Sequence, residues 1–229
     1  MKIVVWDAEI VNDIDGKVVR WTDFDKMHIS VACAFDYTTG DYKVFHQDNL
    51  QGLIDLLVGA DMLAAFNSKG FDNPLIVAEA KRLGLTELDL EALNAKTYDM
   101  LEESRKGYGW TGGRFPSGFK LDDHLMALWG PELLKTESGA LAPRFWREGQ
   151  TGKISDYCLS DVRRERQLFE WAWYGGLFKC AISQGHPVRP PQEMLGLPLT
   201  SRLPYFGGPF TEQAVTTIMA KFNAPASDV

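Results

Sequence analysis

An apolar, β-branched segment near the N-terminus ends in two acidic residues that are two positions apart. Residues 2–10 read KIVVWDAEI, and the acids are Asp7 and Glu9. A run of this kind predicts a buried central strand with a polar end. Because side chains alternate between the faces of a strand, both carboxylates are expected on one face of a sheet. Two carboxylates held this close repel each other unless a cation lies between them, although an isolated pair also occurs where a polar loop begins.

Strand-like and helix-like segments alternate through the first half of the chain. Strands are predicted at residues 2–10, 28–36, 41–46, 62–66 and 96–100, and helices at residues 50–58, 74–83, 101–106 and 121–129. A Thr-Thr-Gly turn signal between the second and third strands predicts an antiparallel hairpin, so the first three strands form a meander. Asn49 and Asn73 are predicted helix caps, and Gly84 is a predicted helix stop. This order predicts an α/β domain with a mixed sheet.

The second half of the chain is less regular. Residues 105–120 are rich in glycine and predict a loop, residues 153–178 show the longest helical pattern, and residues 211–222 predict a last helix. Six prolines interrupt the sequence between Gly185 and this last predicted helix. We therefore predict a main domain at residues 1–182 and a Pro-rich C-terminal extension at residues 183–229.

Composition excludes several classes of protein. The chain has 229 residues and a net charge of −7, which argues against holding duplex DNA through a broad basic surface, although a local basic patch is enough to grip a few nucleotides. No apolar run approaches the ~20 residues that a membrane-spanning helix needs, and the N-terminus is unlike a signal peptide, so no membrane association and a cytoplasmic location are expected. The three cysteines are widely spaced, which indicates neither a disulfide framework nor a zinc knuckle but small buried side chains.

Two further acids occur in sequence patterns, each of which on its own is weak evidence of a functional site. Asp72 follows Asn67 and Phe71 at a predicted strand-to-helix turn, where an acid is also a common helix cap. Asp161 follows Tyr157 by four residues on the long predicted helix, which places both side chains on one face. An amphipathic helix often carries such a pair without any functional role.

Taken together and in this order, the three segments resemble the motifs of the DEDD superfamily of 3′-to-5′ exonucleases. The matching residues are Asp7, Glu9, Asn67, Phe71, Asp72, Tyr157 and Asp161. Position 156 is Asp, where the histidine subclass has its histidine, so the tyrosine subclass (DEDDy) is indicated, as in the proofreading exonuclease domains of DNA polymerases. The resemblance spans about residues 2–175. It implies an RNase H-like mixed β-sheet, an antiparallel meander plus parallel strands, flanked by helices.

The resemblance implies hydrolysis with two metal ions. Asp7 would bridge both ions, Glu9 and Asp161 would complete the site of the ion that activates water, and Asp72 would act largely through water bound to the ions. Tyr157 would orient the attacking water, because an ordinary tyrosine hydroxyl stays protonated at neutral pH. Carboxylate ligands without thiolates or clustered histidines favour Mg²⁺ or Mn²⁺ over zinc. The implied activity is the release of nucleoside monophosphates from single-stranded DNA ends.

Four residues are predicted to bind substrate. Asn67 and Phe71 lie next to the predicted metal site in the sequence, and Arg114 and Trp110 belong to the glycine-rich loop, where cations alternate with aromatic residues. The other interpretation of this loop is a surface segment whose aromatic side chains pack back on the domain.

Three other functions stay open on the sequence alone. An exonuclease that trims RNA 3′ ends would need the same metal site, because only contacts to the 2′ position distinguish RNA from DNA. An RNase H-type endonuclease fits the second and third motifs less well. A non-catalytic nucleic-acid-binding module on this fold would have no need of four mutually repelling carboxylates. DNA is favoured over RNA, the C-terminal extension is a candidate contact for a replication or repair protein, and a bacterial or phage-infected host cytoplasm is the expected setting.

Overall fold

The computed structural model describes residues 1–13, 19–114, 116–134, 141–207 and 210–223, without the side chains of residues 218, 219 and 221–223. The chain divides into two compact units. The first consists of residues 1–99 and 135–165, and the second of residues 100–134 and 166–229. The predicted boundary between residues 182 and 183 falls between two strands that pair with each other, and it stays a prediction.

The first unit is built on a five-stranded mixed sheet in the order β3-β2-β1-β4-β5. Its strands are β1 (Ile3–Ile10), β2 (Ile29–Asp36), β3 (Asp41–His46), β4 (Met62–Ala65) and β5 (Thr97–Asp99). The pairs β1–β2 and β2–β3 are antiparallel, whereas β1–β4 and β4–β5 are parallel. The predicted meander, the additional parallel strands and the α/β class are therefore confirmed.

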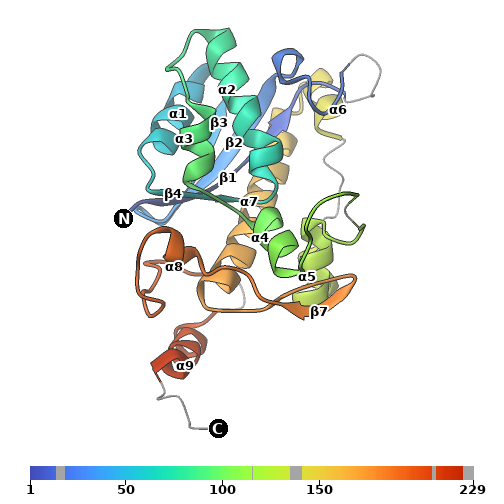
Figure 1. Ribbon diagram of the computed structural model, residues 1–229. Coiled ribbons are helices and arrows are strands. Elements are labelled where there is room, and N and C mark those ends of the chain that lie inside the picture. Colours follow the sequence, from blue (N-terminus) through green and yellow to red (C-terminus); the bar gives the residue numbers. More distant parts are fainter. Residues whose placement is uncertain (14–18, 115, 135–140, 208–209, 224–229) are drawn as a thin grey trace. The chain divides into compact units, whose positions relative to one another are not determined.

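Helices cover both faces of this sheet. The helices of the first unit are η1 (Phe24–Lys26), η2 (Gln47–Asn49), α1 (Leu50–Val58), η3 (Ser68–Gly70), α2 (Asp72–Leu83), α3 (Leu90–Ala95), α6 (Ala142–Arg147) and the N-terminal part of α7 (Thr151–Trp173). Figure 1 shows α1, α2 and α3 together on one side of the strands. Val4, Trp6 and Ala8 of β1 are buried in the core with residues of α1 and α2. The alternate residues of β1 face α7, because the Cys158 thiol on α7 lies 3.8 Å from Oδ2 of the Asp7 side chain.

The second unit contains helices and a small sheet. Its elements are α4 (Met100–Gly107), α5 (Leu121–Trp129), η4 (Pro131–Leu133), the C-terminal part of α7, β6 (Phe178–Cys180), β7 (Ser183–His186), α8 (Pro191–Met194) and α9 (Glu212–Asn223). The predicted helices at residues 121–129 and 211–222 are present. Strands β6 and β7 form an antiparallel pair. Within the described part of the chain, no helix has both the length and the apolar character needed to cross a membrane.

Three local predictions were wrong. Helix α2 begins at Asp72 rather than Pro74, and Asn73 is no cap, because its side chain bonds instead to Ser68, Asn94 and Thr97.

Helix α7 ends at Trp173, and residues 178–180 form a strand. The chain turns back over Trp171, whose indole donates to the Leu177 oxygen at 2.9 Å, so closely that a Cβ on Gly176 would collide with this ring. Asn49 lies at the predicted position before α1 but makes no side-chain cap hydrogen bond.

Candidate metal centre

Strand β1 presents two acids on the face of the sheet that α7 covers. Asp7 and Glu9 are partly buried, whereas the intervening Ala8 is buried on the opposite face. Asp7 pairs in register with Cys33 of β2, whose thiol points to the main-chain oxygen of Ser155 on α7. Both carboxylates therefore lie between the sheet and the helix that carries the third motif.

Three carboxylates converge at this position. Asp7, Glu9 and Asp161 each offer an oxygen atom, and these atoms all lie within 4.8 Å of one another. β1 and α7 thus bring together acids that are about 150 residues apart in the sequence. An all-carboxylate donor set is the kind of site that Mg²⁺ and Mn²⁺ prefer. The side chains present therefore fit a divalent metal ion.

Asp72 lies beside this group at the beginning of α2. It is 4% exposed, and its Oδ1 atom has no hydrogen-bond partner among the described residues. Burial and then the negative charge of Asp7 raise the pKa of Asp72 well above its ordinary value, although the main-chain N–H of Ala8 opposes this shift. A buried carboxylate oxygen without a partner is costly, and a bound cation would offset that cost.

Two further side chains contact the acids directly. Arg164, one helical turn after Asp161, forms an ion pair with it, and both side chains are buried. The thiol of Cys158 lies 3.8 Å from Oδ2 of Asp7. Burial, together with the neighbouring thiol of Cys33 and the charge of Asp7, raises the pKa of Cys158, so this thiol stays neutral. All three cysteines are free and buried, as the sequence predicted.

Tyr157 lies on the same helix as Asp161, four residues earlier. It is partly exposed, in contrast to the fully buried Cys158 that follows it. A separation of four residues places Tyr157 and Asp161 on one side of the helix. The hydroxyl of Tyr157 and the carboxylate of Asp161 thus belong to the same face of α7.

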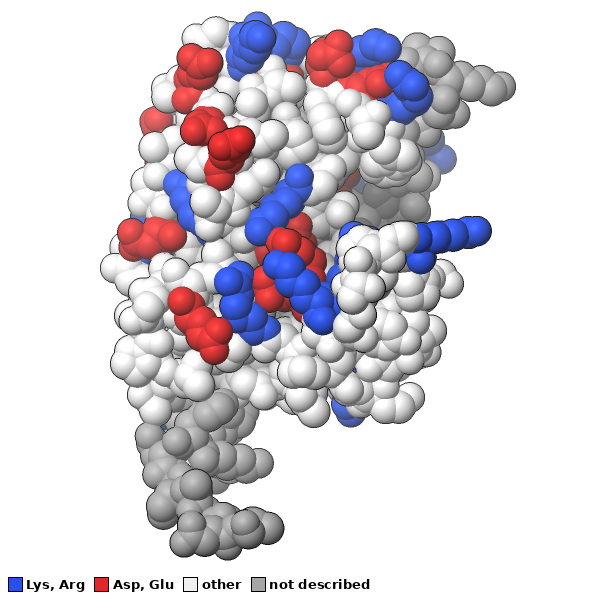
Figure 2. Space-filling model, in the orientation of Figure 1, with Lys and Arg blue, Asp and Glu red and all other residues white. Residues whose placement is uncertain are grey.

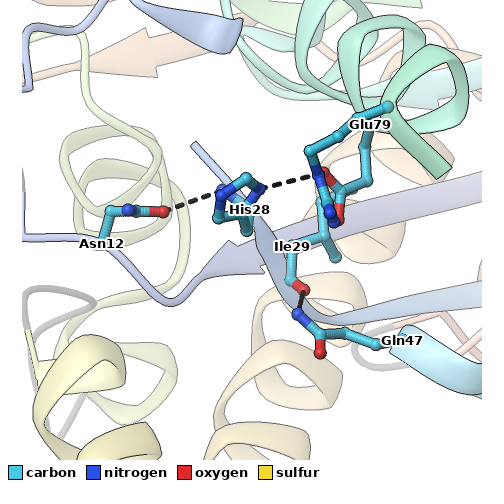
Figure 3. Close-up of polar contacts among 6 residues, drawn as sticks. Asn12, His28, Ile29, Gln47 and Glu79 are labelled. Carbon is cyan, nitrogen blue, oxygen red and sulfur yellow. Dashed lines mark hydrogen bonds and ion pairs between the residues drawn. The ribbon is translucent and has the colours of Figure 1, made fainter. Parts of the chain in front are cut away.

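Helix α2, which begins at Asp72, contains an ion pair two turns further along. The Glu79 side chain is fully buried, and Arg82 donates to both of its oxygens, at 2.9 and 2.5 Å. The Nδ1 atom of His28 lies 3.4 Å from Glu79, and the main-chain N–H of His28 donates to Asn12 at 2.8 Å (Figure 3). Because Asp72 and Glu79 are seven residues apart, they share one face of the helix. The contact between His28 and Glu79 therefore joins α2 to the segment between β1 and β2.

Asn67 and Phe71, the predicted substrate contacts of the second motif, occupy the turn between β4 and α2. Asn67 is exposed and has a positive φ of 68°. Phe71 is partly buried, and its ring makes edge contacts with Trp21 at 5.3 Å and with Phe24 at 6.0 Å between ring centres. Trp21, which the sequence analysis did not single out, is 66% exposed.

The other two predicted substrate contacts, Trp110 and Arg114, belong to the second unit. The guanidinium of Arg105 lies 5.7 Å from the centre of the Trp110 ring, and Arg114 is exposed. Part of the loop packs back, as its alternative interpretation expected, because Phe119 is buried and makes an edge contact with Tyr108. A role of Trp110 and Arg114 in substrate binding stays a prediction.

One acid next to the site escaped the sequence analysis. Asp99 is the last residue of β5 and is 3% exposed. It stands at the carboxyl end of a parallel strand next to β4, the edge at which Asn67 also emerges. Acids at adjacent strand ends are a recognisable signal, and the predicted strand at residues 96–100 already contained this one.

No protein-family model matches the chain, and no curated protein matches it in sequence. Among solved structures, the chain is similar to the family B DNA polymerase from the hyperthermophilic archaeon Pyrobaculum calidifontis, with a TM-score of 0.54 and 18% sequence identity. The similarity covers 76% of this chain but only 25% of the polymerase chain. At this identity the likeness concerns the fold alone. The mixed sheet flanked by helices is consistent with the RNase H-like fold that the motifs implied.

Proposed function

We propose that this chain is a metal-dependent 3′-to-5′ exonuclease that releases nucleoside monophosphates from single-stranded DNA. The observation that carries the proposal is the convergence of Asp7, Glu9 and Asp161 from β1 and α7. Asp72 beside them, and the likeness of the fold to that of a DNA polymerase chain, support it.

The four carboxylates would hold two divalent ions, Mg²⁺ or Mn²⁺. When bound, the ions supply the positive charge that favours a hydroxide-like nucleophile and stabilises the leaving 3′ oxygen. Asp7 belongs to the group of three carboxylates and its charge also acts on Asp72, so Asp7 would help to hold both ions. Tyr157 would hydrogen-bond the attacking water and hold it in line with the scissile bond. The neutral thiol of Cys158 lies against Asp7 and adds no charge to the site.

The charge of the protein suits binding to the end of a single nucleic-acid strand rather than to a long duplex. The net charge is −7, and Figure 2 shows Lys and Arg side chains among Asp and Glu side chains on the face that it draws. Such a surface suits a protein that contacts a few nucleotides through selected cations and aromatic rings. Asn67 and Phe71 next to Asp72, and Trp110 and Arg114 in the second unit, are the proposed contacts.

A strand-shortening assay tests the proposal. Single-stranded DNA and RNA with a 5′ label are incubated with the protein in Mg²⁺, Mn²⁺ or EDTA, and the products are separated by length. A metal-dependent ladder that shortens from the 3′ end of DNA supports the proposal, and a ladder from RNA alone would favour the RNA-trimming alternative. No product from either strand would exclude exonuclease activity.

Two matched variants assign the activity to the site. Asp7→Asn keeps the shape of the side chain but removes its charge and should abolish the ladder. Asp41→Asn makes the same change at an exposed carboxylate on β3 and should leave the ladder intact. Full activity in Asp7→Asn would contradict the assignment of the site.

A further inference from the structure

The turn between β4 and α2 has a constrained backbone. Within the described residues, Asn67 is the only non-glycine residue with a positive φ, at 68°. Most side chains disfavour this left-handed conformation, whereas asparagine tolerates it. The turn is also tight, because a Cβ on Gly70 would lie 2.9 Å from Oδ1 of Asn67. Additional contacts that hold the turn would therefore stabilise an uncommon backbone shape.

Asp99 supplies such contacts. Its Oδ1 atom accepts the main-chain N–H of Asn67 at 3.0 Å, and its Oδ2 atom accepts the main-chain N–H of Lys69 at 3.0 Å. Hydrogen bonds to a buried carboxylate are stronger than those between neutral groups. The parallel register pairs Ala65 with Asp99, so the carboxylate stands where the chain leaves β4. The sheet itself thus fixes the position of Asp99 relative to the turn.

The turn leads directly into the candidate metal centre. Asp72 follows Phe71 without an intervening residue and begins α2. The two hydrogen bonds of Asp99 therefore hold the segment that ends immediately before Asp72. Asn67, at the other end of the turn, is exposed and free to reach a ligand with its side-chain amide.

We propose that Asp99 is a positioning residue for substrate, which acts by holding the turn at residues 66–71 so that the Asn67 amide meets the terminal nucleotide of the strand. This inference rests on the proposed exonuclease function. Asp99 acts through the main chain of the turn rather than on the scissile phosphate. Its loss should therefore weaken substrate binding much more than it slows the chemical step or weakens metal binding.

The first test is a kinetic comparison of wild type with Asp99→Asn. An asparagine at this position keeps the shape of the side chain but can accept only one of the two N–H groups. The expected result is a KM for single-stranded DNA at least tenfold higher, with kcat and the half-saturating Mn²⁺ concentration changed less than threefold. Asp89→Asn is the matched control, because Asp89 also accepts a main-chain N–H, that of Glu91, but at the start of α3. A fall in kcat at unchanged KM, or a loss of Mn²⁺ binding, would overturn the inference.

A double-mutant cycle separates positioning from general damage to the fold. Glycine adopts a positive φ without strain, so Asn67→Gly removes the amide and preserves the turn. Asn67→Gly alone should raise KM, and adding Asp99→Asn should then raise it no further, because the group that Asp99 positions is already gone. Independent, multiplying effects of the two substitutions would overturn the inference.

Hydrogen exchange decides the role of Asp99 without any enzyme activity. In Asp99→Asn, the amide hydrogens of Asn67 and Lys69 should exchange at least tenfold faster than in wild type, whereas amides of the central strands should not change. Unchanged exchange at these two positions would overturn the inference even in a fully active enzyme. A wild-type protein that shortens no strand would overturn the proposed function instead, and the exchange result would still show whether Asp99 holds the turn.

Discussion

The carboxyl group of Asp72 is buried beside that of Asp7, and the charge of Asp7 adds to burial in raising the pKa of Asp72. Two acids in this relationship weaken the fold unless a cation lies between them. Glu9 adds a further negative group to the same place, whereas Asp161, which also belongs to the group, forms an ion pair with Arg164. Without a cation, repulsion between these acids would therefore lower the stability of the first unit.

A divalent ion should therefore stabilise the folded protein. At a Mn²⁺ concentration of 100 times its dissociation constant, binding adds about 2.7 kcal/mol, which corresponds to a rise in Tm of roughly 5–10 °C. Asp7→Asn should abolish this rise. Without metal, Asp7→Asn should be at least as stable as wild type, because the substitution removes a repulsive charge. Thermal melts with and without Mn²⁺ measure both effects, with Asp41→Asn as the control, and an equal rise in Asp7→Asn would contradict the metal centre.

Removal of the Tyr157 hydroxyl should slow catalysis without affecting the metal. Positioning of a reacting group by a side chain contributes on the order of 10²-fold to a rate, so Tyr157→Phe should lower kcat by about that factor. The half-saturating Mn²⁺ concentration should not change, since the grouped carboxylates of Asp7, Glu9 and Asp161 are unaltered in this variant. Tyr42→Phe, on β3, removes a hydroxyl elsewhere in the same unit and should retain full activity. Wild-type kcat in Tyr157→Phe would exclude a role for the hydroxyl in orienting water.

Local patterns predicted the meander because each strand is adjacent in sequence to its partner. The apolar run that ends at Asp7, and the turn signal between β2 and β3, were enough to predict three paired strands. The role of Asp99 was not predictable in this way, because its bonding partners lie 30 and 32 residues earlier in the chain. Such contacts depend on the parallel register of β4 and β5, which the sequence pattern does not specify.

The errors at helix ends have the same origin. Asn73, a short polar residue before Pro74, has the sequence pattern of a helix cap. The same pattern occurs when the side chain forms hydrogen bonds with other elements instead of with its own helix. In the fold, Asn73 bonds to Asn94 and Thr97, which belong to segments some twenty residues later. The spacing of apolar residues likewise predicted that the helix continues past Trp173. In the structure the helix ends there, and the chain turns back over Trp171. Tertiary contacts override local preference at each of these positions.

The loop of the second unit offers a test of strand binding that is independent of the metal. Stacking of a base on an aromatic ring contributes about 1–3 kcal/mol, so Trp110→Ala should weaken binding of single-stranded DNA by roughly 5- to 160-fold. Arg114→Ala should weaken it in a salt-dependent manner, since its charge acts on phosphate. Fluorescence anisotropy with a labelled strand measures both affinities. Tyr205→Ala, an exposed aromatic residue in the same unit, is the control, and unchanged affinity in both loop variants would refute their role.

The buried ion pair of α2 should make a measurable contribution to stability. Hydrogen bonds to charged groups contribute about 1.5–3 kcal/mol, and Glu79→Gln loses the charge that Arg82 and His28 contact. We expect the free energy of unfolding to fall by about 2 kcal/mol in urea titrations. Glu87→Gln, at an exposed position, should change it by less than about 0.5 kcal/mol. Equal stability of the two variants would show that the Glu79 contacts do not anchor α2.

A chain of buried hydrogen bonds in the second unit has a fixed direction. The Nδ1 atom of His124 donates to the Lys179 oxygen at 2.5 Å, so its Nε2 atom must accept from the Ser104 hydroxyl at 3.2 Å. Ser104 in turn accepts from Nε2 of His186 at 2.8 Å, and Nδ1 of His186 accepts from Ser183 at 2.9 Å. The chain requires a neutral His124, because protonation of its Nε2 atom would remove the acceptor of the Ser104 hydroxyl. Burial lowers the pKa of His124 to about 4 and also lowers that of His186.

Stability should therefore fall when the pH is lowered through the range of histidine titration. Between about pH 4 and 6.5, unfolded His124 binds a proton that the folded form excludes, so the free energy of unfolding rises with pH and levels off above 6.5. We expect a loss of about 2 kcal/mol between pH 7.5 and pH 5 from His124 alone. Urea titrations at the two pH values measure it. The loss should be smaller in His124→Gln but unchanged in His46→Gln, at an exposed position, and an equal loss in all three proteins would mean that other groups cause it.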